Sequence, residues 1–465
     1  MKKPTLHFKE PSSGRGDSSS QSTLMYMKRL CVMLLMAVSY CASAQTYTLQ
    51  DCIRAAMANN QQLMNSKLDM SAADYRIREI KSALLPTIDI NGQLLYYQDV
   101  PSQYAPASAF GGSSSEYTKL TMSMAQTTSG NLQVSQNLYN QSVLIGVKAA
   151  KATQEASALQ ELVTRESIVY NVSSTYYSVQ VLADNLDRLA ENIRNLEKTA
   201  QINAILKENE IVSANVHNRM LINLENLRNQ YDNQSLLYDK NITLLKHLMN
   251  VDIGEEIKIS SFDYTESFTL DESDDITQRP DLMLQQAQIR LSEFDKKSVA
   301  AGYYPVLTNT ATFGYSGYYD SFAPHKQINN DWIKTSSFAL TLKIPVFDGF
   351  RKQNQLRQKE IAIQKNLNTL SLMKSSANKE LIDAKENYIA NRNLLASNKK
   401  SLDLAEQLFS SSQSEYENGI TSITEFLNAQ NDLTTARTNY SNALLNLKLA
   451  ELSLKKANGT LLTNQ

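Results

Sequence analysis

The residue types that most often carry out catalysis or bind metals are few and widely spaced in this chain. Its four histidines are His7, His217, His247 and His325, and the separation of His217 from His247 does not suit two ligands on one helix face. The sequence contains no H-E-x-x-H, G-x-S-x-G or glycine-rich phosphate-binding motif. These observations favour a function other than catalysis.

An acidic cluster is the other group of side chains that could do chemistry. It allows two interpretations, a cation site or a solvated linker that caps the next helix, and the second is the more common use of such a run. We therefore predict no metal site and no cofactor. The net charge of −1 also gives no electrostatic reason to expect a nucleic-acid partner. The cluster consists of Asp271, Glu272, Asp274 and Asp275.

The C-terminal stretch contains a heptad pattern that must position any functional residue near it. Large residues recur every seven positions, and an alanine lies three places after each. Such a repeat is typical of a helix that supercoils against a partner. We predict one arm of a long hairpin whose tip lies near residues 417–419 and whose end is Asn458-Gly459. The large residues are Phe426, Leu433, Tyr440, Leu447 and Leu454, and the small ones are Ala429, Ala436, Ala443, Ala450 and Ala457.

The same tip occurs earlier in the chain. Residues 208–213 (ENEIVS) match residues 417–422 (ENGITS), and Tyr231 then matches Tyr440. Pro86 and Pro305 each end a helical pattern and begin an alternating one. The sequence therefore predicts a tandem duplication: a first repeat over residues 45–251, a linker over 252–278 and a second repeat over 279–465.

The N-terminal region predicts export. Residues 27–44 have the charged, apolar and small-residue parts of a signal peptide, with cleavage expected before Gln45. Residues 1–26 are interpreted as a non-native or unstructured extension, with Met1, Met25 and Met27 left open as starts. Cys41 is a poor lipidation site because Tyr40 precedes it. After cleavage only Cys52 remains, so we expect no internal disulfide.

Each repeat is predicted to contain helices and two strands. The expected helices cover residues 45–85, 141–206, 279–303 and 350–410, followed in each half by the returning arm of a hairpin. The expected strands cover residues 86–98, 117–139, 305–319 and 335–347, with loops at 99–116 and 320–334. Asp348 and Gly349 form the predicted bend into the long helix of the second half.

The strands alternate between apolar and polar residues, so each has one apolar face. Strands of this length are able to span a membrane, but lipid tolerates no open sheet edge and the smallest known membrane barrels have eight strands. Four strands therefore call for an oligomer, in which two copies supply eight strands and three copies supply twelve. A soluble β-layer is the alternative that the pattern leaves open.

Five short motifs, in order, make the chain resemble the TolC-type outer-membrane efflux protein family (the outer membrane factors). The likeness covers about residues 45–459. Cys52 departs from the family's first motif, where alanine is usual. The motifs are T-L-Q-D-C-I-R-A-A from Thr48, L-L-P ending at Pro86, R-P-D-L from Arg279, P-V-F-D-G ending at Gly349 and the Y-x-x-G-x-x-S box from Tyr416 to Gln430.

The resemblance implies a mixed α+β membrane protein that is mostly α. Long coiled-coil hairpins would form a periplasmic tunnel, and four strands from each protomer of a homotrimer would build a twelve-stranded β-barrel in outer-membrane lipid of a Gram-negative bacterium. The implied function is a passive exit duct for small molecules or polypeptides in efflux or type I secretion. The implied partners are a periplasmic adaptor (membrane fusion) protein and an inner-membrane pump of the RND, ABC or MFS type.

The resemblance also assigns site residues. The periplasmic gate would comprise Tyr416, Thr421, Glu425 and Asn428, and three Glu425 carboxylates around one axis would attract cations. A solvated helix face is the alternative for Glu425. Glu210 stands where many members have glycine, and Lys207 matches Tyr416 of the second half. The adaptor-contacting tips would be Asn209, Glu210, Ile211, Asn418, Gly419 and Ile420, and the helix–strand junctions Pro86, Pro305, Asp348 and Gly349.

One further alternative remains open at this point. An exported coiled-coil structural or surface-interaction protein without a pore would explain the heptads. It would leave the four amphipathic strands and their junction motifs unexplained. Extraction behaviour distinguishes the two hypotheses, because a barrel needs detergent and a coiled-coil rod does not.

Overall fold

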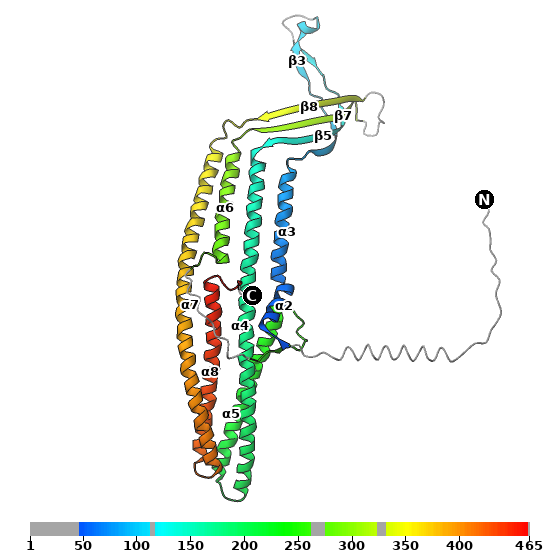
Figure 1. Ribbon diagram of the computed structural model, residues 1–465. Coiled ribbons are helices and arrows are strands. Elements are labelled where there is room, and N and C mark those ends of the chain that lie inside the picture. The colour runs from blue at the N-terminus through cyan, green and yellow to red at the C-terminus, as the bar shows by residue number, and fades with distance from the viewer. Residues whose placement is uncertain (1–45, 112–116, 262–274, 323–331, 464–465) are drawn as a thin grey trace, which may run out of the picture.

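The protein is elongated, with a β-sheet at one end and the tips of two helical hairpins at the other (Figure 1). The computed structural model describes residues 46–111, 117–261, 275–322 and 332–463. The predicted N-terminal extension, the predicted signal peptide and three members of the acidic cluster, Asp271, Glu272 and Asp274, lie outside the described residues.

Two long helices run the length of the molecule, and shorter helices lie along them (Figure 1). α7 packs on α6 and α8, these pack on α4, and α4 packs on α3 and α5, so the described helices form a wall with α7 at one side. The bounds are α2 Leu49–Asn59, α3 Gln61–Ser82, α4 Gln141–Glu208 and α5 Ala214–Met249 in the first half, and α6 Pro280–Ala301, α7 Arg351–Glu417 and α8 Ile423–Ala457 in the second.

One predicted helix is two helices. The pattern over residues 45–85 predicted continuous helix, but the chain breaks at Asn60, whose side-chain oxygen accepts hydrogen bonds from the backbone N–H groups of Gln62 and Leu63. Asparagine competes with helical hydrogen bonding in this way and so favours caps. The heptad pattern correctly predicted the long helices α4, α5 and α8. The long helix expected over residues 350–410 is also present as α7, which continues to Glu417.

The main sheet is antiparallel with the strand order β2-β5-β7-β8. Each half of the chain contributes two neighbouring strands, and β5 and β7 join the halves at the centre. The bounds are β2 Thr87–Tyr96, β5 Gln126–Asn140, β7 Val306–Tyr319 and β8 Ile333–Lys343.

Two of the strand predictions were wrong in their bounds. The strand expected over residues 117–139 is divided, because β5 begins at Gln126, opposite the end of β2 at Tyr96. The earlier part, β4 Tyr117–Leu120, pairs with β3 Gln103–Pro106 beyond the sheet, and the short helix η1 Ala107–Phe110 lies within the expected loop. β8 ends at Lys343 rather than 347, two residues before Pro345, which has no N–H to donate.

The two faces of the sheet differ sharply in polarity. Cross-strand neighbours Ile90, Leu132 and Phe313 share one face, and Phe338 lies on the same face of β8. Within the described protomer these side chains are exposed, Ile90 to 83% and Phe338 to 72%. The opposite face carries mainly hydroxyl and amide side chains, such as those of Asn131 and Thr310. The predicted alternation is therefore present.

The helical core is divided into separate clusters along the wall. One lies around Val172, Leu245 and Met249 at mid-height, beside the strand pair β1 Thr46–Tyr47 and β6 Lys258–Ile259. β6 falls within the segment predicted as a linker. Another cluster lies where the two hairpin ends meet. No helix in the described ranges is apolar over a length sufficient to cross a bilayer.

Candidate functional site

The ends of the α4–α5 and α7–α8 hairpins are built on the same backbone turn. In each, an asparagine side chain donates at 2.8 Å to the carbonyl four residues earlier: Asn209 to Ile205, and Asn418 to Ser414. Corresponding backbone bonds agree in length, because Ile211 N–H donates to Leu206 O at 2.8 Å and Ile420 N–H donates to Glu415 O at 2.8 Å. The matching sequences found at residues 208–213 and 417–422 therefore form the same turn.

The turn requires a left-handed residue at its third position. Gly419 has φ +71° and Glu210 has φ +60°. Glycine adopts this conformation without a side-chain clash, whereas glutamate does so at a cost of about 1–2 kcal/mol. The departure noticed in the sequence, Glu210 in place of glycine, is accommodated without any change of turn.

A hydrogen bond joins the two hairpins near their ends, and an aromatic stack there joins the α7 and α8 arms of the second hairpin. The Tyr416 hydroxyl donates to Asn203 Oδ1 at 2.8 Å, and its ring stacks on Phe426 with centroids 5.2 Å apart. The Phe409 ring also packs against Phe426, with centroids 5.8 Å apart. Asn203 is fully buried, and burial raises the pKa of Tyr416, an effect that the hydrogen bond to Asn203 partly offsets. We call the Tyr416–Asn203 pair the latch.

Sequence reasoning missed Asn203, although a signal for it was present. Leu182, Leu189 and Leu196 recur every seven residues, and Asn203 is the next member of that series. A polar residue in an apolar heptad register is a known device for fixing the arrangement of helices. Here its amide also donates to the carbonyl of Thr199 at 3.0 Å, which orients the oxygen toward Tyr416.

The four predicted gate residues fall into two groups. Tyr416 and half-buried Thr421 lie at the junction of the hairpins, where both line a groove. Glu425 and Asn428 lie on the exposed side of the first turns of α8, away from buried Phe426. The Glu425 N–H donates to the N-cap hydroxyl of Ser422 at 3.3 Å, so the start of α8 is fixed. Glu425 is not among the residues that line the groove.

The groove between the hairpin ends is lined mainly by aliphatic side chains of the first hairpin and by both polar and apolar side chains of the second. The first hairpin supplies aliphatic side chains and the second supplies most of the polar ones, including the carboxylate of Glu417. The lining residues are Thr199, Ile202, Leu206, Ile211, Val212 and Val216 from the first hairpin, and Gln413, Tyr416, Glu417, Gly419, Thr421, Ser422, Ile423 and Phe426 from the second.

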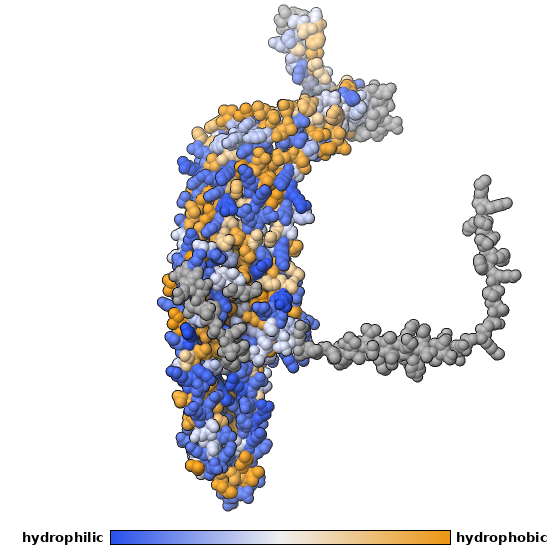
Figure 2. All heavy atoms as spheres, in the orientation of Figure 1, coloured by the Kyte–Doolittle hydropathy of each residue, from blue (hydrophilic) through white to orange (hydrophobic). Residues whose placement is uncertain are grey.

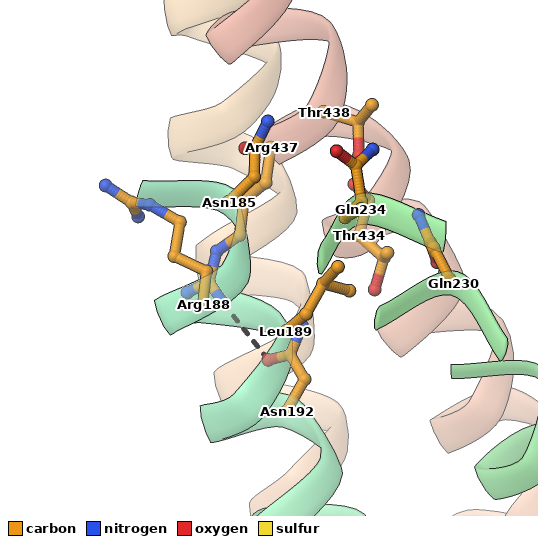
Figure 3. A pocket seen from close by; sticks show the side chains of 9 residues that line it. All are labelled: Asn185, Arg188, Leu189, Asn192, Gln230, Gln234, Thr434, Arg437 and Thr438. Carbon is orange, nitrogen blue, oxygen red and sulfur yellow. Dashed lines mark hydrogen bonds between the residues drawn. The ribbon is translucent and has the colours of Figure 1, made fainter. Parts of the chain in front are cut away.

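A second inter-hairpin contact lies farther from the tips, in a small polar cavity between α4, α5 and α8 (Figure 3). Arg437 donates through Nη1 to Asn192 Oδ1 at 3.2 Å, and its Nη2 lies 3.5 Å from Glu406 Oε1 on α7. Arg437 thus connects α8 to both long helices. Nothing in the spacing of the sequence identified it.

The predicted junction residues lie where the helices meet the sheet. Pro86 directly precedes β2, and Pro305 directly precedes β7. Asp348 accepts from the backbone N–H of Lys352 at 3.2 Å and lies 3.1 Å from its ammonium, while Gly349 has φ +67°. These contacts turn the chain from β8 into α7.

Comparison with known proteins identifies a family. The model of the family described as outer membrane efflux protein matches residues 52–209 and 273–460. The outer membrane protein TolC of Escherichia coli (strain K12) is 22% identical over 468 residues, covering 94% of this chain and 87% of TolC.

Solved structures of outer-membrane channels share the fold. CusC superposes with a TM-score of 0.72 at 16% identity, covering 88% of this chain and 92% of CusC. The Campylobacter jejuni CmeC channel superposes with a TM-score of 0.69 at 18% identity, covering 89% of this chain and 85% of CmeC. The architecture described above is therefore that of a known class of channel.

Proposed function

This chain belongs to the outer membrane efflux protein family and is an outer-membrane efflux channel that extends into the periplasm, not an enzyme; from that premise we propose how the duct is built. Three copies join their four-stranded sheets into one twelve-stranded barrel. The long helices continue the barrel as a tunnel whose gate lies at the hairpin ends. The resemblance stated from the sequence is confirmed by the family match.

The main observation in support of the barrel is that the sheet of a single protomer is incomplete. In the part of the chain that the structure describes, β2 and β8 each pair on one side only, so both edges offer unpaired backbone groups. Lipid does not tolerate open edges, whereas pairing β8 of one copy with β2 of the next removes them. The exposed apolar face then contacts lipid, and the hydroxyl- and amide-rich face lines the duct.

Aromatic side chains at both ends of the sheet support its placement in a membrane. Membrane barrels carry aromatic girdles at the two interfaces, flanking an apolar band. One group lies at the ends of the strands farther from the helices, where Tyr96 and Phe322 pack edge to face at 5.1 Å. The other lies at the helical end and comprises Tyr139, Tyr303, Tyr304, Phe347 and Phe350.

The helical wall also has apolar side chains suited to contact with neighbouring copies. α7 exposes Leu372, Ile382 and Leu404, and α3 exposes Leu68 and Tyr75 on the other side of the wall. A closed ring of copies would bury such apolar side chains on both sides of each protomer's wall. They support the proposed trimer.

We propose two elements in the gate. The latch holds the second hairpin against the first in the closed state, and three copies of Glu425 and Asn428 form a polar ring around the axis. The tips at Asn209–Ile211 and Asn418–Ile420 contact the periplasmic adaptor, which connects the duct to an inner-membrane pump of the RND, ABC or MFS type. The pump selects the cargo, small molecules or polypeptides, and the wall supplies the conduit.

The proposed domains are two copies of one repeat, residues 45–251 and 279–465, joined by 252–278, after a signal peptide at 27–44. The corresponding order of elements supports them. A helix, two sheet strands and a long hairpin occur as α3, β2, β5, α4 and α5, and again as α6, β7, β8, α7 and α8.

The test combines the mass of the extracted complex, its conductance and the depth of its tryptophan in the membrane. The mature protein extracted from outer membranes in mild detergent is expected to have the mass of three protomers and to form pores in a planar bilayer. The sequence has one tryptophan, Trp332, which directly precedes β8, so brominated lipids should quench its fluorescence most strongly when bromine lies near the interface. A water-soluble monomer without conductance would contradict the channel and support the coiled-coil alternative.

A further inference from the structure

Charged residues are rare in the four strands of the main sheet, and all of them lie on its two edge strands. Asp89 on β2, with Lys334 and Lys343 on β8, are the only charged residues in these strands. Asp89 and Lys343 share the hydroxyl- and amide-rich face, whereas Lys334 lies on the apolar face with Phe338. Figure 2 shows apolar residues gathered over the sheet. The face proposed to line the duct therefore has one carboxylate and one ammonium group in each protomer.

Asp89 and Lys343 do not meet within one protomer. Both side chains are exposed, and neither forms an ion pair with any residue that the structure describes. β5 and β7 lie between β2 and β8. Three strand spacings, about 14 Å in all, therefore separate the two edges of the sheet. The only groups that either charge can reach across its own edge belong to another molecule.

The register of the sheet shows which parts of the two edges meet in a closed barrel. Thr87, at the start of β2, aligns through β5 and β7 with Ala339 of β8. β8 then continues beyond Ala339 to Lys343, toward the helices. The strand ends are thus staggered, as they must be in a barrel whose strands tilt. Because symmetric copies hold β2 at one height, the end of β8 lies at the level of the start of β2 in the next copy.

The tilt of a membrane barrel limits this stagger to two values. A tilt of about 35–45° corresponds to a shift of roughly four to six residues over four strands. An odd shift would turn every side chain to the wrong face, so about four or about six remains. With about six, Lys343 lies directly opposite Asp89 of the next copy. With about four, it lies opposite Thr87, and Asp89 is its diagonal neighbour, within reach of a long side chain.

We propose that Lys343 of one copy forms an ion pair with Asp89 of the next copy across each seam of the barrel. The inference rests on the proposed function and names the residues by which a second copy of this chain is recognised. An exposed ion pair adds little to stability, but complementary charges fix the register of an interface. The three pairs also leave the strand wall of the duct without net charge.

Cysteine pairs measure the register directly. In a Cys52→Ala background, Lys343→Cys is combined in separate variants with Thr87→Cys, Asp89→Cys or Gln93→Cys, all on the same face. After oxidation, the pair with position 87 or 89 should give covalently linked oligomers up to the trimer on a denaturing gel, because a disulfide needs Cα atoms within about 7 Å. A link that forms best at position 93, or none in a trimeric protein, would overturn the proposal.

Charge substitutions test the ion pair itself. Lys343→Glu places two carboxylates at each seam and should make the detergent-solubilised trimer dissociate roughly fivefold faster at low salt. Asp89→Lys should have the same effect, and the two together should restore the wild-type rate because the pair is reversed. Lys334→Glu is the matched control, with the same charge change on the other face of β8, and Asp89→Lys should not rescue it. A reversed pair that fails to restore the rate would contradict the ion pair.

The mass and conductance of the wild type identify which idea has failed. A protein that is not trimeric and forms no pores contradicts the proposed function itself. A trimer of normal conductance whose cysteine pairs do not link, or whose reversed pair is not restored, contradicts only this inference. If the single charge variants do not assemble, the cysteine pairs decide the question, because they place no like charges at the seam.

Discussion

The two hairpin ends show how two copies of one backbone turn come to make different side-chain contacts. Their turns agree bond for bond, but the side chains at matching positions differ: Lys207 corresponds to Tyr416, and Ser412 corresponds to Asn203. The latch joins Tyr416 to Asn203, so it uses non-equivalent positions of the two copies. The turn depends on its backbone hydrogen bonds, its asparagine and its left-handed third residue. The remaining side chains differ between the two copies, so one copy supplies the donor of the latch and the other its acceptor.

The largest effect is expected from removing the latch tyrosine together with its ring. Tyr416→Ala deletes the stack on Phe426 and leaves the Asn203 oxygen without a protein partner, so the cluster between the hairpins should lose about 3–5 kcal/mol. The channel should open, with higher single-channel conductance in planar bilayers. Lys207→Ala, at the duplicate position, is the control and should leave conductance unchanged. An equal rise in both variants would contradict the asymmetry of the hairpins.

Substitutions in the ring proposed at Glu425 and Asn428 test the second element of the gate. Both side chains are exposed on α8, so their removal should widen the aperture without loosening the hairpin contact. Glu425→Ala combined with Asn428→Ala should raise conductance. Glu425→Gln keeps the size and removes the charge, so it should lower the preference for cations, measured by reversal potentials in a salt gradient. If the double variant conducts like wild type, the assignment of the ring is wrong.

A smaller effect isolates the hydrogen bond of the latch. Tyr416→Phe keeps the ring but leaves the buried Asn203 oxygen unsatisfied, which should cost about 1–3 kcal/mol. The expected readout is a lower midpoint of thermal unfolding and a modest rise in open probability. Asn203→Leu in the Tyr416→Phe background should recover part of the loss, because neither partner then remains unpaired.

The same hydrogen bond predicts that the conductance of the closed state changes at alkaline pH. Burial raises the pKa of Tyr416 above its ordinary value of 10.0, so the folded state favours the protonated hydroxyl. This contribution to stability is fully present below the ordinary pKa and is lost as the pH rises through the higher value of the folded state. Closed-state conductance should therefore be constant through neutral pH and rise only in strongly alkaline solution in wild type. A similar rise in Tyr416→Phe would show that another group is responsible.

Particular residues show what the sequence could and could not predict. Heptads with few breakers predicted the long helices, and the ENEIVS and ENGITS segments predicted both tips, because these features act through local backbone geometry. The break at Asn60 and the division of the strand before Gln126 depend on a local cap and on where the partner strand ends. Asn203 illustrates the limit for the site, because its bond to Tyr416 exists only once packing brings α4 and α7 together.

The smallest effects concern the left-handed residue of each turn, where the two ends can be compared directly. Gly419→Ala introduces a side chain at φ +71° with no other atom within 4 Å, so the cost is conformational, about 1 kcal/mol. Glu210→Gly should do the reverse and relieve strain at φ +60°, although the more flexible unfolded chain offsets part of the gain, leaving a stabilisation of less than about 1 kcal/mol. Hydrogen exchange of the tip amides measures both, because tips open locally. Destabilisation by Gly419→Ala together with stabilisation by Glu210→Gly would show that the two turns share one backbone conformation and differ only in their side chains. Equal destabilisation by both substitutions would mean that the Glu210 side chain makes a stabilising contact of its own.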